Sequence, residues 1–349
     1  MTTPPVEVVD FFSGCGGTSQ GFQDAGMSII AGIDNDVSAA MTFRTNFPDA
    51  IFFERDIRDI EVAEVEKVIS GNAPVLFSGC APCQPFSKQN RQKKGVDDPR
   101  RSLLAEFQRF VVEIQPDFVV VENVPGLQRI GKNEGPLRTF INALEETSYD
   151  VWSGILSALD FGVPQLRRRL VLVAAKRPMR APVPERTHGG GLETYSTVRD
   201  WVYGLPDLEA GGVDPDDPDH AALGLSALNQ RRIAATPEGG GRDSWPPDLL
   251  LDCHKDHSGH KDVYGRLAWD RPASAMTTRC ISYSNGRFGH PVKNRAISIR
   301  EAACLQTFPR SFQFFGTMTS RGVQIGNAVP PLLARRIGDA VVDVASRIQ

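Results

Sequence analysis

Residues 6–17 have the sequence Val6-Glu7-Val8-Val9-Asp10-Phe11-Phe12-Ser13-Gly14-Cys15-Gly16-Gly17, and this stretch decides the fold. Its first half is a β-branched and aromatic run of strand length, and its second half is a turn with glycines at positions 14, 16 and 17. Glycine allows a tight turn and lets a ligand approach the backbone within van der Waals contact. A strand that ends in such a turn is typical of a loop that binds a nucleoside cofactor.

Outward from this stretch, the first half of the chain alternates between short apolar runs and amphipathic segments of helix length. The predicted strands are residues 6–12, 27–33, 75–77, 118–121 and 169–175, and the predicted helices are residues 37–46, 61–70, 102–114 and 137–147. This alternation is typical of βαβ units. We therefore expect the α/β fold class, with a mostly parallel, Rossmann-like sheet and helices on both of its faces.

The composition changes after residue 176. Residues 178–296 carry clusters such as Gly189-Gly190-Gly191 and show little helical periodicity, which predicts a smaller, loop-rich second domain. Helical patterns return at residues 298–306 and 331–348, and Arg300-Glu301 is interpreted as organising the second domain. We expect the first domain to comprise residues 1–177 plus 297–349, and the second to comprise residues 178–296.

The composition also excludes several classes of protein. With 349 residues, of which 41% are hydrophobic, the chain can bury a large core. Its six cysteines suggest no disulfide framework, and it has neither a secretory signal nor an apolar run of the roughly 20 residues that span a membrane, so we expect a cytoplasmic protein. The net charge of −3 argues against a protein that coats polyanions, whereas basic clusters at 88–101 and 167–169 favour local phosphate contacts.

A second informative stretch, Gly79-Cys80-Ala81-Pro82-Cys83-Gln84-Pro85-Phe86-Ser87, follows the predicted strand at residues 75–77. It presents a thiol on a short loop bounded by prolines, as expected for a nucleophile at the end of a strand, and Cys83 is the candidate. Cys80 gives a Cys-x-x-Cys spacing with Cys83. No second cysteine pair completes a zinc site, so a packing role is the better interpretation of Cys80.

Five motifs, in this order, resemble those of the DNA (cytosine-5) methyltransferase family. They are residues 10–17, residues 79–87, Glu122-Asn123-Val124, Gln165-Leu166-Arg167-Arg168-Arg169 and Gly326-Asn327-Ala328-Val329-Pro330. The resemblance spans nearly the whole chain and implies the fold of S-adenosylmethionine-dependent methyltransferases, with residues 178–296 as the target-recognition domain. The implied activity is transfer of a methyl group from S-adenosylmethionine to carbon 5 of a cytosine flipped out of a short, specific sequence of duplex DNA.

The chemistry of cytosine explains why such a site needs a thiol. Carbon 5 is weakly nucleophilic, and a thiolate that adds at carbon 6 pushes electron density onto it. On the resemblance, Cys83 forms this covalent adduct, and Glu122, a strand-end carboxyl that desolvation can keep protonated, holds the ring N3 and the exocyclic amine. Alternation along an extended segment points Arg167 and Arg169 to one side, so both should face the site. The resemblance implies that Arg167 contacts the base and that Arg169 supports the thiol and the base.

The glycine turn and an acid about 20 residues further on predict the cofactor site. Asp34 follows the second strand, where an acid typically accepts hydrogen bonds from ribose hydroxyls. The resemblance implies S-adenosylmethionine, with Phe12 against the adenine and Asp56-Ile57 at its edge. The cofactor-binding candidates are Phe12, Gly14, Gly16, Gly17, Asp34, Asn35, Asp56, Ile57, Asn327 and Val329. Asn35 stands where some relatives have an aromatic residue that stacks on the adenine.

Double-stranded DNA is the implied partner, and its target base must leave the stack to be reached. The candidate DNA contacts are Ser87 and Arg100 in a basic loop, Gln165, and Thr277 in Ala275-Met276-Thr277-Thr278-Arg279-Cys280. We expect a monomer, and a separately encoded restriction endonuclease can be a further partner in a restriction-modification system. We expect no metal; the cluster Cys253, His254, His257 and His260 is interpreted as phosphate contacts or packing.

Two other functions remain as alternatives at this point. One is methylation of cytosine in tRNA, as in a related branch, although the chain lacks the Cys-Phe-Thr signature of that branch. The other is a catalytically silent DNA-binding regulator with the same fold, which the set of Cys83, Glu122 and Arg167 argues against. A nicotinamide-dependent dehydrogenase would leave Cys83 and the arginine motif unexplained.

Overall fold

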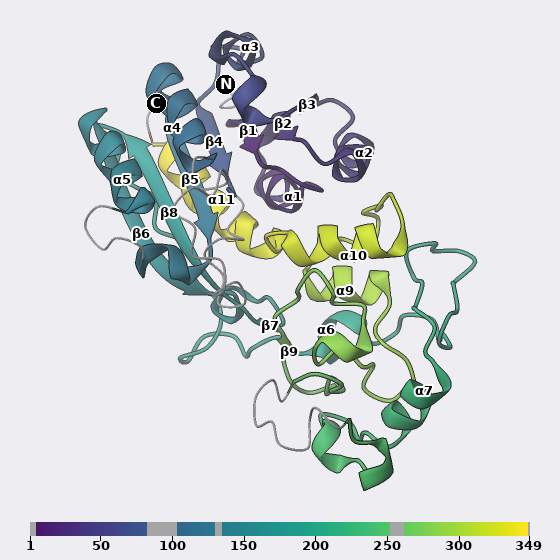
Figure 1. Cartoon of the computed structure of the whole chain (residues 1–349). Helices are drawn as coiled ribbons and strands as arrows, with labels where there is room; N and C mark the ends of the chain where they lie inside the picture. The colour runs from purple at the N-terminus through teal and green to yellow at the C-terminus, as the bar shows by residue number, and fades with distance from the viewer. Residues whose placement is uncertain (1–4, 82–102, 130–134, 252–261, 348–349) are drawn as a thin grey trace. The chain divides into compact units, whose positions relative to one another are not determined.

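The structure is a computed structural model, and it describes residues 5–81, 103–129, 135–251 and 262–347. The chain divides into two compact units. Unit 1 comprises Met1–Ser157, Arg168–Arg186 and Val329–Gln349, and unit 2 comprises Ala158–Arg167 and Thr187–Ala328. In Figure 1 the strands of unit 1 are coloured purple to teal, and the loops and short helices of unit 2 are coloured teal to yellow-green.

Unit 1 is built around a seven-stranded sheet with the order β3-β2-β1-β4-β5-β8-β6. The strands are β1 (Glu7–Phe11), β2 (Ser28–Asp34), β3 (Ile51–Glu54), β4 (Val75–Gly79), β5 (Phe118–Asn123), β6 (Tyr149–Ser157) and β8 (Arg168–Lys176). All neighbours from β3 to β5 pair in parallel, whereas β8 is antiparallel to both β5 and β6. The prediction of a mostly parallel sheet is confirmed.

Helices cover both faces of this sheet (Figure 1). They are α1 (Gly17–Asp24), α2 (Val37–Asn46), α3 (Val62–Glu66), α4 (Leu103–Ile114), α5 (Pro136–Glu146) and α11 (Pro331–Ala345), with 3-10 turns η1 (Ile57–Asp59) and η5 (Pro125–Arg129). On β1, the Phe11 ring lies 5.0 Å from that of Phe107 in α4, whereas Asp10 accepts a hydrogen bond from Ser19 in α1. Successive side chains of a strand point to opposite faces, so α4 and α1 lie on opposite faces of the sheet.

An aromatic cluster fills the core on the α4 face. The ring of Phe11 lies 5.0–5.1 Å from the rings of Phe77, Phe107 and Phe110, and all four side chains are fully buried. Aromatic pairs of this kind add about 0.5–1.5 kcal/mol each beyond the burial of their area. A Cβ on Gly79 would lie 2.8 Å from the Phe107 ring, so the core requires glycine where β4 ends.

Helix α1 packs closely against α11, the last helix of the chain. A Cβ on Gly21 would lie 2.2 Å from the Pro331 carbonyl oxygen, and a Cβ on Gly338 would lie 2.8 Å from the Cβ of Ala25. The two glycines therefore allow the backbones to approach, and segments from both ends of the sequence complete unit 1. None of the helices in the described residues combines the length and the apolar character that crossing a membrane requires.

Unit 2 has little regular structure, and buried charged groups hold much of it together. Its elements are η6 (Ala158–Phe161), β7 (Gln165–Leu166), α6 (Val198–Val202), α7 (Ala227–Ala234), η7 (Arg242–Ser244), η8 (Pro247–Leu249), β9 (Ala273–Ser274), η9 (Tyr283–Asn285), α9 (Ile299–Leu305) and α10 (Met318–Asn327). Arg295 donates to both carboxylate oxygens of Glu301 at 2.7 and 2.8 Å, with each side chain 2% exposed. Arg300 donates to Asp217 at 2.6 Å.

The boundaries of the two units differ from the predicted domains. Residues 158–167 and 297–328 group with unit 2, whereas the prediction placed both segments in the first domain; residues 178–186 group with unit 1. The helical pattern at 298–306 suggested a return to the first domain. Instead, the buried ion pairs of Arg300 and Glu301 fix α9 within unit 2.

Candidate active site

The glycine turn predicted as the cofactor loop joins β1 to α1. The Gly14 N–H donates to Oδ2 of Asp34 at 2.8 Å, which pins the turn to the carboxyl end of β2. Gly14 and Gly16 have φ angles of +51° and +93°, a region that favours glycine. A Cβ on Gly16 would also lie 2.4 Å from the Phe47 ring. The turn therefore requires glycine at position 16 for both reasons.

The carboxylate of Asp34 holds this loop. Its Oδ2 accepts the Gly14 N–H, and its Oδ1 accepts the N–H of Asp36 at 2.9 Å. Burial raises the pKa of Asp34, and these hydrogen bonds oppose the shift. Each carboxylate oxygen can accept a second hydrogen bond, so Asp34 can fix the loop and still bind hydroxyl groups. Its neighbour Asn35 is exposed.

The turn leaves room for a ligand. No atom lies within 4 Å of the position that a Cβ on Gly14 would occupy, so the backbone there faces open space. Phe12, with a φ angle of +57°, is half-buried against the core of unit 1. An open glycine turn, an aromatic ring and an acid with spare acceptors fit the adenosine part of S-adenosylmethionine.

The other cofactor candidates have different surroundings. Asp56 pairs with Arg58 at 2.6 Å, and the hydrogen bond from that guanidinium lowers the pKa of Asp56. Ile57 and Val329 are 3% and 5% exposed, so both residues pack in the interior of unit 1. Asn327 is the exposed last residue of α10, in unit 2.

The predicted nucleophile Cys83 lies outside the described residues, as do Ser87, Arg100 and the cluster Cys253, His254, His257 and His260. Cys80 is described, and its Sγ lies 3.6 Å from Oγ1 of Thr18. Burial, and next the charge of Glu122, raise the pKa of the Cys80 thiol well above its usual value. Because the thiolate is the nucleophilic form, Cys80 is poorly suited to attack a substrate.

Asn123 is a site residue that the sequence analysis did not select. Its Nδ2 donates to the Ala81 carbonyl oxygen at 3.3 Å, and its Oδ1 accepts the Val124 N–H at 2.9 Å. The side chain is 3% exposed. Asn123 thereby ties the end of β5 to the chain that leaves β4, two residues before Cys83. A signal was present in the sequence, because this amide directly follows Glu122 in a strand-end motif.

Glu122 and Arg169 form an ion pair within unit 1. Nε of Arg169 lies 2.7 Å from Oε1 of Glu122, and the side chains are 19% and 11% exposed. The two residues come from the neighbouring strands β8 and β5, near the carboxyl end of β5. A carboxyl group and a guanidinium that are both largely shielded from water can hold the polar edge of a ring. The role of Glu122 as an acid stays a prediction.

Gln165 and Arg167 are buried within unit 2. Gln165 is 0% exposed; its Nε2 donates to the Leu305 carbonyl oxygen at 2.6 Å, and its Oε1 accepts the Met276 N–H at 2.9 Å. Its amide is therefore engaged in joining segments of unit 2, which corrects the prediction that Gln165 contacts DNA. Arg167 donates to the carbonyl oxygens of Met276 and Ala328 at 3.1 and 2.9 Å, so it supports backbone.

Thr277 is exposed on unit 2, in the segment that follows β9. A Cβ on Gly326 would lie 2.1 Å from the carbonyl carbon and oxygen of Thr277. The glycine of the Gly326-Asn327-Ala328-Val329-Pro330 motif therefore lets α10 lie directly against this segment. The backbone of the Thr277 segment is fixed, which suits a side chain that must meet DNA at a defined position; the contact itself stays a prediction.

Asp10, at the end of β1, is a second residue that the sequence analysis passed over. It is fully buried, and its Oδ2 accepts the Ser19 hydroxyl at 2.7 Å. Its Oδ1 completes no hydrogen bond of normal geometry among the described residues, although Ser78 lies opposite it on β4. Burial raises the pKa of Asp10 to about 7, a shift that the hydroxyls of Ser19 and Ser78 oppose. Asp10 can therefore carry a proton near neutral pH.

Comparisons with known proteins agree with this geometry. The family model for C-5 cytosine-specific DNA methylases matches residues 6–343. The Type II methylase M.HgiDII of Herpetosiphon aurantiacus is 42% identical over 340 residues, which cover 96% of this chain and 94% of the relative. The Type II methyltransferase M1.HphI of Haemophilus parahaemolyticus is 34% identical over 336 residues, which cover 96% of this chain and 86% of the relative.

A solved structure extends the likeness to the fold. It is described as a DNA modification methyltransferase encoded within a prophage of Escherichia coli, is 25% identical, and covers 98% of this chain and 99% of its own at a TM-score of 0.77. The sequence motifs, the sheet and the family model agree. This chain belongs to the C-5 cytosine-specific DNA methylases and is an S-adenosylmethionine-dependent DNA (cytosine-5-)-methyltransferase.

Proposed function

We propose that Cys83 is the nucleophile of the methyl transfer. Its thiolate forms an Sγ–C6 bond with cytosine as the C5–C6 π pair moves onto carbon 5. After carbon 5 has gained the methyl group, its proton leaves to a base and the Sγ–C6 bond breaks, which restores the ring and the thiolate. Bound S-adenosylmethionine supplies that methyl group. Two observations support Cys83: Asn123 fixes the carbonyl of Ala81 just before it, and the rival thiol of Cys80 has a raised pKa.

In this proposal Glu122 and Arg169 hold the cytosine ring. The Glu122 carboxyl holds N3 and the exocyclic amine of the ring, which selects cytosine because thymine has an N–H at N3 and a carbonyl in place of the amine. Arg169, 2.7 Å from Glu122, supports the base and the thiolate with its positive charge. Arg167 acts through the backbone that it binds at Met276 and Ala328, as a positioning residue rather than a base contact.

Phe12, the glycine turn and Asp34 hold the adenosine of S-adenosylmethionine in this proposal. Phe12 packs against the adenine, and the spare lone pairs of Asp34 accept the ribose hydroxyls. Support comes from the open space beside Gly14 and from the two backbone hydrogen bonds that orient the carboxylate. Gly16 and Gly17 shape the turn and begin α1.

We also propose that the enzyme acts as a cytoplasmic monomer on a short, specific sequence of duplex DNA. A separately encoded restriction endonuclease would cut the same sequence when it is unmethylated, and the Type II methyltransferases among the relatives support this pairing. Thr277, Ser87 and Arg100 remain the predicted DNA contacts. Light scattering should give the mass of one 38.2 kDa chain in solution; twice that mass would rule out the monomer.

Nucleoside mass spectrometry with sequence-resolved mapping tests the reaction. Duplex DNA of diverse sequence is incubated with S-adenosylmethionine and the wild-type protein, Cys83→Ser or Cys80→Ala. We expect 5-methylcytosine at one short motif with the wild type and with Cys80→Ala, and none with Cys83→Ser. The matched cysteine variant shows that any loss at position 83 is not a general effect of removing a thiol from this loop.

Two further measurements separate the explanations of a negative result. Cys83→Ser should still bind duplex DNA. DNA with 5-fluorocytosine at the target should trap a covalent adduct with the wild type and with Cys80→Ala but not with Cys83→Ser, because fluorine cannot leave carbon 5 as a proton does. Turnover by Cys83→Ser comparable to wild type would refute the covalent mechanism. Methylation of tRNA but not of DNA would favour the RNA alternative.

A further inference from the structure

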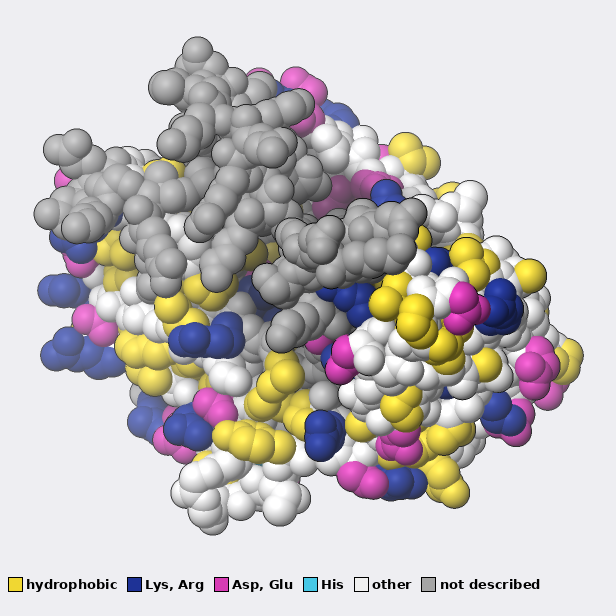
Figure 2. Space-filling model, turned by 60° about the horizontal axis from the view of Figure 1, so that its bottom comes forward, with side chains coloured by type: hydrophobic (Ala, Val, Ile, Leu, Met, Phe, Trp, Pro, Cys, Tyr) yellow, Lys and Arg dark blue, Asp and Glu magenta, His cyan; other side chains and the backbone are white. Residues whose placement is uncertain are grey.

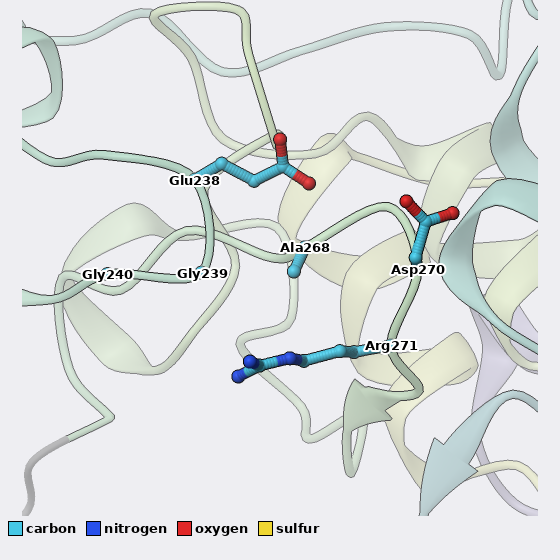
Figure 3. A pocket seen from close by; sticks show the side chains of 6 residues that line it. All are labelled: Glu238, Gly239, Gly240, Ala268, Asp270 and Arg271. Carbon is cyan, nitrogen blue, oxygen red and sulfur yellow. The ribbon is translucent and has the colours of Figure 1, made fainter.

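A hollow of about 500 Å³ opens on unit 2 (Figure 3). Its lining residues are Glu238, Gly239, Gly240, Ala268, Asp270 and Arg271. In Figure 3 the carboxylates of Glu238 and Asp270 lie on one side of Ala268, and the Arg271 side chain extends along the other. The hollow combines hydrogen-bond donors and acceptors in one place.

The glycine wall of the hollow is held rigidly. Nη1 of Arg287 donates to the carbonyl oxygens of Gly239 and Gly240, at 2.7 Å to each. The Gly239 N–H donates to the Leu267 carbonyl oxygen at 3.0 Å. Gly239 has a φ angle of +66°, and a Cβ there would come within 3.3 Å of the Cβ of Ala268. The positive φ angle and this close approach favour glycine at position 239, and a Cβ on Gly240 would lie 2.7 Å from the Pro237 ring.

The two acids of the hollow differ in how much hydrogen-bonding capacity they retain. Asp270 accepts two hydrogen bonds from Arg199, at 2.6 and 2.9 Å, which neutralise its charge. Glu238 accepts the Trp269 N–H through Oε1 at 2.7 Å, and its Oε2 has no further hydrogen bond among the described residues. Glu238 is therefore an oriented acceptor with one oxygen available to a ligand.

Arg271 is the oriented donor. Its backbone is fixed, because its carbonyl oxygen accepts the Val198 N–H at 3.0 Å. In the described part of the chain its guanidinium makes no hydrogen bond or ion pair, whereas Arg231 and Lys293 of the same unit pair with carboxylates at 2.5 and 2.7 Å. Figure 2 shows the common pattern on one face of the molecule, where Lys and Arg side chains lie beside Asp and Glu. The exposed guanidinium of Arg271 is left available for a ligand.

We propose that Arg271 and Glu238 read one G·C base pair of the target sequence in the major groove. The guanine edge presents two acceptors, N7 and O6, and the cytosine edge presents the N4 amine as a donor. A guanidinium matches the first pattern with two parallel hydrogen bonds, and a carboxylate oxygen matches the second. The reversed C·G pair and both A·T pairs present other patterns of donors and acceptors. Arg271 and Glu238 together can therefore distinguish all four base pairs.

The position of the pair along the DNA is bounded by the chain. Thr277 is the sixth residue after Arg271, and six steps along the chain span at most about 20 Å. The rise of DNA is about 3.4 Å per base pair, so the recognised pair lies within about six steps of the target cytosine. This inference rests on the proposed methylation of a short, specific DNA sequence, with Thr277 near the flipped base.

Methylation of a randomised duplex library, followed by sequence-resolved mapping of 5-methylcytosine, tests the proposal. With Arg271→Ala we expect the preference at one G·C position to fall by about 5- to 150-fold, while the preferences at the other positions persist. Glu238→Gln keeps an oxygen for the Trp269 N–H but replaces the free acceptor with an N–H donor. It should therefore weaken the choice of cytosine at the same pair.

Arg310→Ala is the matched control, because Arg310 is another exposed arginine of unit 2 whose side chain forms no ion pair with an acid in the described residues. It should leave the sequence preference unchanged. A uniform loss of methylation over all sequences with Arg271→Ala, or an unchanged preference in a folded variant, would overturn the proposal. A wild type that methylates no DNA would instead refute the proposed function, and thermal unfolding of each variant identifies a loss caused by misfolding.

Discussion

The two units of this enzyme are held together by different forces. Unit 1 packs the rings of Phe11, Phe77 and Phe107 beneath a sheet, whereas unit 2 buries Arg295 against Glu301 and surrounds Arg266 with backbone carbonyl groups. Apolar burial depends little on pH, but a buried ion pair is destabilising as soon as one partner is lost. A substitution that removes one buried charge should therefore lower the stability of unit 2 more than that of unit 1.

The titratable groups of the two units also respond to pH in opposite directions. Burial raises the pKa of Asp10 in unit 1 to about 7, and it lowers the pKa of His290 in unit 2 to about 4. Both side chains are thus neutral in the folded protein over a range where they would be charged in the unfolded chain. Through Asp10, the stability of unit 1 should fall as the pH rises. Through His290, the stability of unit 2 should fall as the pH is lowered.

The largest expected effect is on unit 2. Glu301→Ala leaves Arg295 buried without its partner and should destabilise unit 2 by about 3–5 kcal/mol. Hydrogen exchange of the full-length protein, followed by mass spectrometry, reports each unit through its own peptides. The control is Asp248→Ala, which removes the exposed pair with Arg231 and should cost about 1 kcal/mol or less. Equal losses of stability in the two variants would contradict the claim that buried ion pairs hold unit 2 together.

The next effect is the pH response of unit 1. Unfolded Asp10 loses its proton near pH 3.8, but the folded form keeps it up to about pH 7. A shift of about three pKa units corresponds to about 4 kcal/mol, so this stability is present below pH 3.8 and is lost as the pH rises to 7. In Asp10→Asn, the free energy of unfolding, measured with denaturant from pH 4 to 8, should fall less with rising pH than in the wild type. Parallel curves for the variant and the wild type would contradict the assignment.

The smallest of the three effects is the pH response of unit 2. The Nδ1 of His290 accepts the N–H groups of Val292 and Lys293, and burial holds the ring neutral down to about pH 4. The unfolded side chain takes up a proton near pH 6.5, so about 3 kcal/mol should be lost as the pH falls from 6.5 to 4. His290→Asn keeps an acceptor and should remove this dependence from the exchange of unit 2 peptides alone.

The sequence predicted the central strands of the sheet but not its edges. The central strands β1, β4 and β5 are buried almost throughout, so each contains a short run of apolar residues that could be found in the sequence. The edge strands β3 and β6 were not predicted, because each has one unpaired side and mixes exposed with half-buried positions. The helix at 37–46 was predicted with its observed bounds, and the Asp36 side chain caps its start by accepting the N–H groups of Ser38 and Ala39.

The residues of the candidate site also differ in whether they could be predicted from the sequence. Asp34 and Glu122 could be selected because each polar residue follows a buried strand, and parallel strands bring their carboxyl ends together. The interior of unit 2 could not be predicted, because Gln165 and Arg266 are residue types that usually face water. Only the fold shows that carbonyl groups from distant segments surround them.

The close contact of α1 with α11 has a consequence for protein synthesis. Residue 24, where α1 ends, is made 321 residues before residue 345, where α11 ends. At a synthesis rate of about 5–20 residues per second, α11 is made roughly 15 to 60 seconds after α1 and the cofactor turn before it. Over that time Phe22, buried beside Gly338 in the finished enzyme, has no such cover. A nascent chain therefore cannot complete its cofactor-binding unit on the ribosome before the last helix has been made.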